Sequence, residues 1–120
     1  MAMTKENKQE VIQRLLVGKQ KAHILETSLR FEGKGEEADK VALKASDLSN
    51  QIDTLLAQVL EEWLGQTDAI IQAVKTANTA LQQSIRKIQQ GVKTAENLVK
   101  AIGLLDDLIA TASQIAKAIV

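Results

Sequence analysis

The clearest hydrophobic pattern in the chain lies between residues 36 and 64. Apolar residues recur there at intervals of 4, 3, 4, 3 and 4 positions: Val41, Ala45, Leu48, Ile52, Leu55 and Val59. This spacing is the a/d pattern of a heptad repeat and places the side chains on one face of an α-helix. Leu56, Leu60 and Trp63 extend the stripe on a neighbouring face. We therefore expect a helix over residues 36–64 that buries this face against other helices.

A second and longer apolar pattern occupies residues 67–119. One set of positions recurs every seven residues: Val74, Leu81, Ile88, Ala95, Ile102, Ile109 and Ala116. Another set with the same period lies between them: Ala77, Ser84, Gly91, Leu98, Leu105, Ala112 and Ile119. At Ser84 and Gly91, the second set has small residues where a large apolar residue would be expected.

The segment IQQGVKTAEN, residues 88–97, allows two interpretations of this pattern. In the first, Gly91 ends one helix and Thr94 caps the next, which gives helices over 67–90 and 94–119. In the second, the helix is continuous from 67 to 119, because the seven-residue phase survives Gly91. Such a helix would be roughly 80 Å long, and a second subunit would cover its overhang. We favour the turn, because it gives four segments of similar length that close into a compact bundle.

The N-terminal third of the chain predicts a helix over residues 5–32, with Thr4 as its N-cap. Its apolar residues recur at helical spacing but spread widely around the helix: Val11, Ile12, Leu15, Leu16, Ala22, Ile24, Leu25, Leu29 and Phe31. Gly18 weakens the middle of this helix by about 1 kcal/mol relative to Ala. In the segment FEGKGEE, Gly33 and Gly35 can adopt the positive φ that ends a helix, and the acidic residues that follow favour a new N-terminus.

These patterns predict an all-α protein with a single domain over residues 1–120. We expect an antiparallel bundle of four helices at about 5–32, 36–64, 67–90 and 94–119. The alternative is three helices, with a long continuous last helix over 67–119. The chain has no proline and only two aromatic residues, and no alternating strand pattern is visible.

Charge supports packing of the second helix between neighbours of opposite sign. Residues 1–34 carry seven basic and four acidic side chains, residues 35–64 carry two and seven, and residues 65–120 carry six and four. The 15 basic and 15 acidic residues of the whole chain balance, so no overall field attracts nucleic acid or anionic lipid.

The segment EEWLGQTD, residues 61–68, contains the one Trp of the chain, followed two positions later by Gly. In its placement between two helices it resembles the W-x-G feature of small secreted helical-hairpin proteins of type VII secretion. The match covers three residues, and the chain departs from that family in its additional preceding helix and in having no Tyr for the family's C-terminal signal. We interpret Gly65 as the end of one helix and Thr67 or Asp68 as the cap of the next.

Candidate catalytic and metal-binding residues are few. His23 lies three positions before Glu26, but one His and no Cys fall short of the ligand sets of bundle metal sites, so we expect an ordinary boundary histidine. The pairs Glu36–Glu37, Glu61–Glu62 and Asp106–Asp107 point in different directions on a helix and form no acid–base pair. We expect Asp106–Asp107 beside the apolar face, either towards solvent or in an ion pair with another helix.

No phosphate-binding loop or nucleic-acid surface is expected either. VGKQKA and EGKGEE contain Gly-Lys without completing a phosphate-binding loop. Five basic residues give the first helix a basic character, but Glu6 and Glu10 lie among them, which favours a solvated face. We therefore expect no enzymatic activity, no cofactor, no small-molecule substrate and no nucleic-acid partner.

The function that these observations favour is protein–protein association, with a second copy of the chain or another helical protein as partner. Residues 98–120 hold more large aliphatic side chains than one buried helix face needs. We therefore expect the interaction surface there: Leu98, Ile102, Leu105, Leu108, Ile109, Ile115 and Ile119. With no signal peptide or membrane-spanning segment visible, we expect a soluble cytoplasmic protein, and secretion without a signal peptide stays open. The alternatives are a secreted W-x-G-type hairpin and a membrane-active protein that uses the amphipathic segment 98–120.

Overall fold

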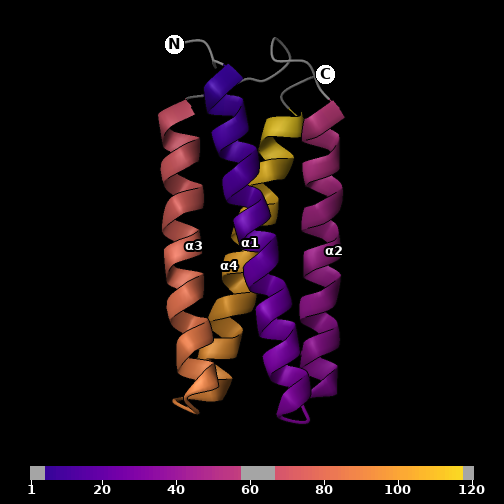
Figure 1. Cartoon of the computed structure of the whole chain (residues 1–120), viewed down its shortest axis with the longest axis vertical. Helices are drawn as coiled ribbons and strands as arrows, with labels where there is room; N and C mark the ends of the chain where they lie inside the picture. Colours follow the sequence, from indigo (N-terminus) through magenta and orange to yellow (C-terminus); the bar gives the residue numbers. More distant parts are fainter. Residues whose placement is uncertain (1–4, 58–66, 118–120) are drawn as a thin grey trace.

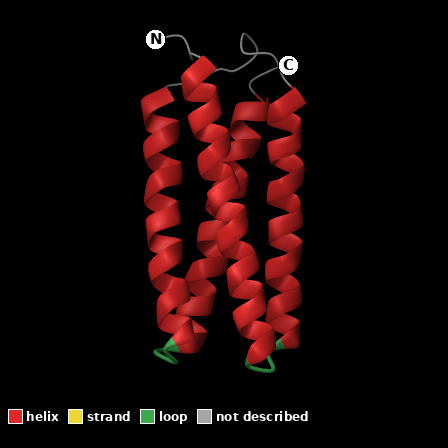
Figure 2. Ribbon diagram, viewed as in Figure 1, coloured by secondary structure: helices red, strands yellow, loops and turns green. Residues whose placement is uncertain are grey.

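The computed structural model describes residues 5–57 and 67–117, which form four helices packed into an elongated bundle (Figure 1). The helices are α1 (Lys5–Phe31), α2 (Gly35–Ala57), α3 (Thr67–Gln89) and α4 (Thr94–Lys117). The described residues contain no strand (Figure 2), which confirms the predicted all-α bundle. Residues 90–93, between the end of α3 and the start of α4, form a turn, so the alternative of one continuous helix over 67–119 is wrong. The expected helix end after residue 57 and the segment Trp63-Leu64-Gly65 lie outside the described residues, as does Thr4.

The spatial order of the helices differs from their order along the chain. α1 and α2 form one antiparallel hairpin, and α3 and α4 form another. Between the hairpins, α1 packs against α3 and α2 packs against α4, whereas α1 and α4 lie diagonally opposite (Figure 1). Both hairpins have their short turn at the same end of the bundle. The antiparallel arrangement therefore holds within each hairpin, and the neighbours α1/α3 and α2/α4 run parallel.

Two glycines end the first helix of each hairpin in the same way. Gly33 and Gly91 have φ angles of 76° and 72°, in the left-handed region that favours glycine. In each turn, the residue after the glycine donates its backbone N–H to the carbonyl five residues earlier, at 2.8 Å. This is the Schellman arrangement, which satisfies carbonyls left free at a helix C-terminus. Gly35, the other predicted breaker, is instead the first residue of α2.

The turn between α3 and α4 is one residue longer than the turn between α1 and α2. The additional residue, Lys93, has a positive φ of 44°, a conformation that costs free energy for a side chain other than glycine. α4 begins at Thr94, the predicted capping position. The side chain of Asn97 bonds back across the turn, donating to the carbonyls of Val92 and Lys93 at 2.9 and 3.2 Å. The sequence pattern did not single out Asn97.

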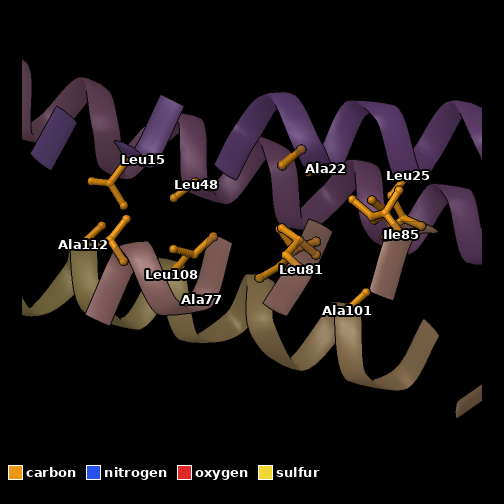
Figure 3. Packing of buried hydrophobic residues seen from close by; sticks show 14 of the residues in the cluster. Leu15, Ala22, Leu25, Leu48, Ala77, Leu81, Ile85, Ala101, Leu108 and Ala112 are labelled. Atoms are coloured by element: carbon orange, nitrogen blue, oxygen red, sulfur yellow. The ribbon is translucent and has the colours of Figure 1, made fainter. Parts of the chain in front are cut away.

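The bundle interior holds residues from all four helices (Figure 3). The described residues of the a/d set in α2 are all buried: Val41, Ala45, Leu48, Ile52 and Leu55. Leu56, which was expected to extend the stripe on a neighbouring face, is instead 56% exposed. In α3 the buried residues include members of both predicted sets: Val74, Leu81 and Ile88 of the first, and Ala77 and Ser84 of the second.

The first of the two predicted seven-residue sets does not continue into the core of α4. Ala95 is exposed, and Ile102 and Ile109 are only partly buried. The core of α4 is instead formed by Leu98, Ala101, Leu105, Leu108 and Ala112. Three of these residues, Leu98, Leu105 and Ala112, belong to the second predicted set, so that set returns to the core after the turn, whereas the first set does not.

Candidate association surfaces

The residues predicted to form an interaction surface on α4 divide into three groups. Leu98, Leu105 and Leu108 are buried in the core of their own bundle, with at most 8% of their surface exposed. Ile102 and Ile109 are partly buried and pack against that core. The side chain of Ile115 and residue Ile119 lie outside the described part. Since the three large leucines stabilise the chain's own fold, the surfaces open to a partner must include other residues.

An ion pair joins α2 and α4 on the side of α4 that carries Ile102 and Ile109. Lys44 Nζ lies 2.6 Å from Asp106 Oδ1, and both side chains are partly exposed. The hydrogen bond to Asp106, together with its negative charge, raises the pKa of Lys44 above its ordinary value. Of the two arrangements expected for Asp106, the structure shows the ion pair with another helix. Asp107 lies on the opposite side, in the groove between α3 and α4.

That groove is an apolar concave surface of the bundle. It has a volume of about 600 Å³ and is lined mainly by small side chains: Ala69, Gln72, Ala73, Thr76, Ala77, Ala80, Leu104, Asp107, Ala110 and Thr111. Asp107 is the one charged side chain among them. Because Ala and Thr project little from a helix, they leave a hollow between α3 and α4 and would allow the backbone of another helix to approach closely.

The groove follows from the sequence of α3. Its buried stripe faces α1 and α4, while Ala69, Ala73 and Ala80 occupy the side turned away from the core towards solvent. An exposed helix face usually carries long charged or polar side chains. A run of alanines at such positions had no assigned role in the sequence pattern, because single alanines favour a helix without indicating what the helix faces.

The other candidate residues lie in ordinary surface interactions. His23 is exposed, with its Nδ1 3.8 Å from Glu26 Oε1. Arg30 bridges Glu26 on α1 and Asp39 on α2, and its Nη2 lies 3.0 Å from a carboxylate oxygen of each. The hydrogen bond to Asp39, and next the bond to Glu26, raise the pKa of the Arg30 guanidinium. Within residues 5–57 and 67–117, no group of three or more His, Asp or Glu side chains is placed to hold a metal ion.

Comparisons with other proteins identify no relative of this chain. No protein-family model matches it, and neither the curated proteins nor the solved structures include a significant match. None of the described helices has the combination of length and apolar character that crossing a bilayer requires.

Proposed function

We propose that this chain is a non-catalytic association protein and that the groove between α3 and α4 binds the same groove of a second copy. The observation that carries the proposal is the lining of that groove, in which five alanines and two threonines accompany a single charged residue. Such a surface presents apolar area without long side chains that would have to be ordered or desolvated. The partly buried Leu104 adds a larger aliphatic side chain to the same surface.

The groove is part of a longer face formed by α3 and α4. α3 and α4 have 23 and 24 residues, so each is about 35 Å long. Adjacent helices lie about 10 Å apart, so a face two helices wide can contribute to the ~1,000 Å² that a specific interface buries. Two copies related by a two-fold axis would use the same surface, which closes the assembly as a dimer.

The test is the mass of the protein in solution, measured by light scattering from micromolar to near-millimolar concentration. Ala73→Glu places a long charged side chain in the groove and should shift the mass towards that of the monomer without unfolding the bundle. Ser46→Glu adds the same charge at an exposed position of α2 and should leave association unchanged. A wild-type mass that is strictly monomeric over the whole range would reject self-association.

Of the two alternatives that the sequence raised, the membrane-active role is less favoured than association. A membrane-active role for residues 98–120 would require Leu98, Leu105 and Leu108 to leave the core, where they stabilise the fold. The W-x-G hypothesis concerns residues outside the described part. Leakage of dye from liposomes would support the first alternative, and secretion dependent on Trp63 would support the second.

A further inference from the structure

A second groove, between the parallel helices α1 and α3, differs in character from the groove between α3 and α4. Polar bonds between described residues join these helices at several levels. The amide of Asn78 donates to the carbonyl of Arg14 at 2.8 Å, Lys21 donates to the side-chain oxygen of Gln82, and Gln89 donates to Ser28 Oγ at 3.2 Å. The groove beside this row of bonds has a volume of about 410 Å³ and is lined by Arg14, Val17, Lys21, Lys75, Asn78, Thr79, Gln82, Gln83 and Arg86.

The charge of this groove has one sign. Four of its lining residues are cationic, Arg14, Lys21, Lys75 and Arg86, and none is acidic. Arg14 is partly neutralised by Glu10, whose Oε1 lies 2.9 Å from its Nη2. Lys21 bonds to a neutral amide, and within the described residues neither Lys75 nor Arg86 has an ion-pair partner. The groove thus concentrates positive charge in a chain whose net charge is zero.

An exposed apolar stripe on α1 begins at the groove and continues beyond the residues that line it. Val17, Ile24 and Phe31 follow one another at intervals of seven residues, and 40%, 48% and 89% of their surfaces are exposed. Val17 also lines the groove itself. Their spacing places them near one side of α1, next to the polar positions Arg14, Lys21 and Ser28. None of these three side chains belongs to the core of the bundle.

We propose that the groove between α1 and α3 binds an amphipathic helix of a partner protein, with acidic residues beside an apolar stripe. Carboxylates along such a helix would complement Lys21, Lys75 and Arg86, and its apolar side chains would cover Val17 and Ile24. This is the helix-in-groove mode of recognition, in which complementary charge fixes the orientation of the partner. The surface is separate from the groove between α3 and α4, so this binding does not depend on self-association.

The shape and composition of the surface favour a helix over other polyanions. A bilayer is flat and would contact the ridges of the helices, whereas the cations surround a hollow between two helices. Single-stranded nucleic acid is usually held by aromatic side chains that stack on its bases, and no aromatic residue lines this groove. Duplex DNA presents a rigid backbone far wider than the space between two adjacent helices.

The experiment uses the full chain and a fluorescein-labelled synthetic helix of three heptads, with Leu at positions a and d and Glu at positions e and g. Fluorescence anisotropy should show that this peptide binds and that the same peptide with Lys in place of Glu does not. Raising the salt concentration from about 50 mM to about 500 mM should weaken binding, because it screens the charges. The double variant K21E/R86E should bind roughly tenfold more weakly than the wild type. The control K40E/K100E makes the same change of charge at exposed positions of α2 and α4, and it should bind like the wild type.

Two further measurements complete the test. Ile24→Ser removes apolar surface without a change of charge and should also weaken binding. Amide chemical shifts of the wild-type protein should change on α1 and α3 when the Glu peptide is added, which locates the site without any substitution. Equal losses in K21E/R86E and K40E/K100E, or shift changes confined to other helices, would overturn the proposal. Tighter binding to phosphatidylserine vesicles or to a DNA duplex than to the Glu peptide would also overturn it, by assigning the face to lipid or to nucleic acid.

Discussion

A Cβ atom on Gly18 would lie 2.7 Å from Cδ1 of Leu108, although these residues belong to the diagonally opposite helices α1 and α4. Asn78 Oδ1 and Leu48 Cδ2 lie 3.0 and 3.8 Å from the same point, so side chains of the other three helices converge on this glycine. The absent side chain lets Leu108 reach across the centre of the bundle. The cost of a glycine within α1 is therefore offset by packing that the sequence pattern could not reveal.

The first prediction concerns this contact. Gly18→Ala should lower the free energy of unfolding by about 1–2 kcal/mol, because the clash with buried Leu108 outweighs the gain in helix propensity. Leu108→Val should remove part of the clash, so the same Gly18→Ala change in that background should be neutral or stabilising. Urea unfolding of the wild type, the two single variants and the double variant gives the four free energies of unfolding of this double-mutant cycle. Equal effects of Gly18→Ala in both backgrounds would show that the clash with Leu108 is not what destabilises this variant.

The second prediction concerns Gly103, the exposed glycine of α4. No other atom lies within 4 Å of a Cβ built at this position, and its φ is not positive. Gly103→Ala should therefore raise the free energy of unfolding by about 0.5–1 kcal/mol, through helix propensity alone. Thermal unfolding followed by circular dichroism measures the effect. A lower melting temperature would mean that Gly103 contacts another molecule, because no contact within the bundle opposes a side chain at this position.

The third prediction concerns the turn between α3 and α4. Gly91→Ala should destabilise the bundle by about 1 kcal/mol, because alanine must adopt the left-handed conformation. Lys93→Gly should stabilise it by about 0.5 kcal/mol, because glycine relieves the same strain one residue before α4. Chemical denaturation of each variant gives the sign of its change in the free energy of unfolding. Destabilisation by Lys93→Gly would show that the side chain of Lys93 contributes more than its backbone costs.

The fourth prediction concerns the pH dependence of the ion pair between Lys44 and Asp106. Because the folded protein holds the pKa of Lys44 above its ordinary value of 10.5, the pair stabilises the fold fully below that pH. Its contribution should be lost as the pH rises through the higher pKa of the folded state. Both groups are partly exposed, so the total should be below about 1 kcal/mol.

Lys44→Met, compared with the control Lys40→Met, isolates this effect. The free energy of unfolding of Lys44→Met should be lower than that of the control at neutral pH, and the difference should shrink above about pH 10.5. High salt should also reduce it. A difference that is constant with pH would mean that the aliphatic part of Lys44, and not its charge, stabilises the junction of α2 and α4.

Much of the fold could be predicted because its determinants are local. The stripe from Val41 to Leu55 and the breakers Gly33 and Gly91 each act within a few residues, so four helices and two short turns follow directly from the sequence. The choice between the turn and a continuous helix could not rest on phase. A seven-residue period continues through Gly91 although the chain turns there: its second set returns to the core of α4 at Leu98, Leu105 and Ala112, and its first set does not.

The surfaces were harder to predict because they depend on which helices are neighbours. An excess of leucines on α4 indicated an interface, but Leu105 and Leu108 satisfy the bundle's own core instead. The basic groove requires α1 and α3 to lie side by side, although Arg14 and Arg86 are far apart in the sequence. Acidic residues among the basic ones in α1 indicated a solvated face, whereas the parallel packing of α3 brings Lys75 and Arg86 to the same groove as Arg14 and Lys21.

The parallel placement of the two hairpins makes their order along the chain interchangeable. The end of α2 and the start of α3 lie at the end of the bundle opposite the short turns, together with the start of α1 and the end of α4 (Figure 1). Both pairs of ends belong to diagonally opposite helices, so a linker as long as residues 58–66 could join α4 to α1 as well as it joins α2 to α3. A circular permutant that begins with α3 and finishes with α2 would keep every contact between the helices. Its two hairpins would then fold as the same units in reversed order, since each forms from residues close in sequence.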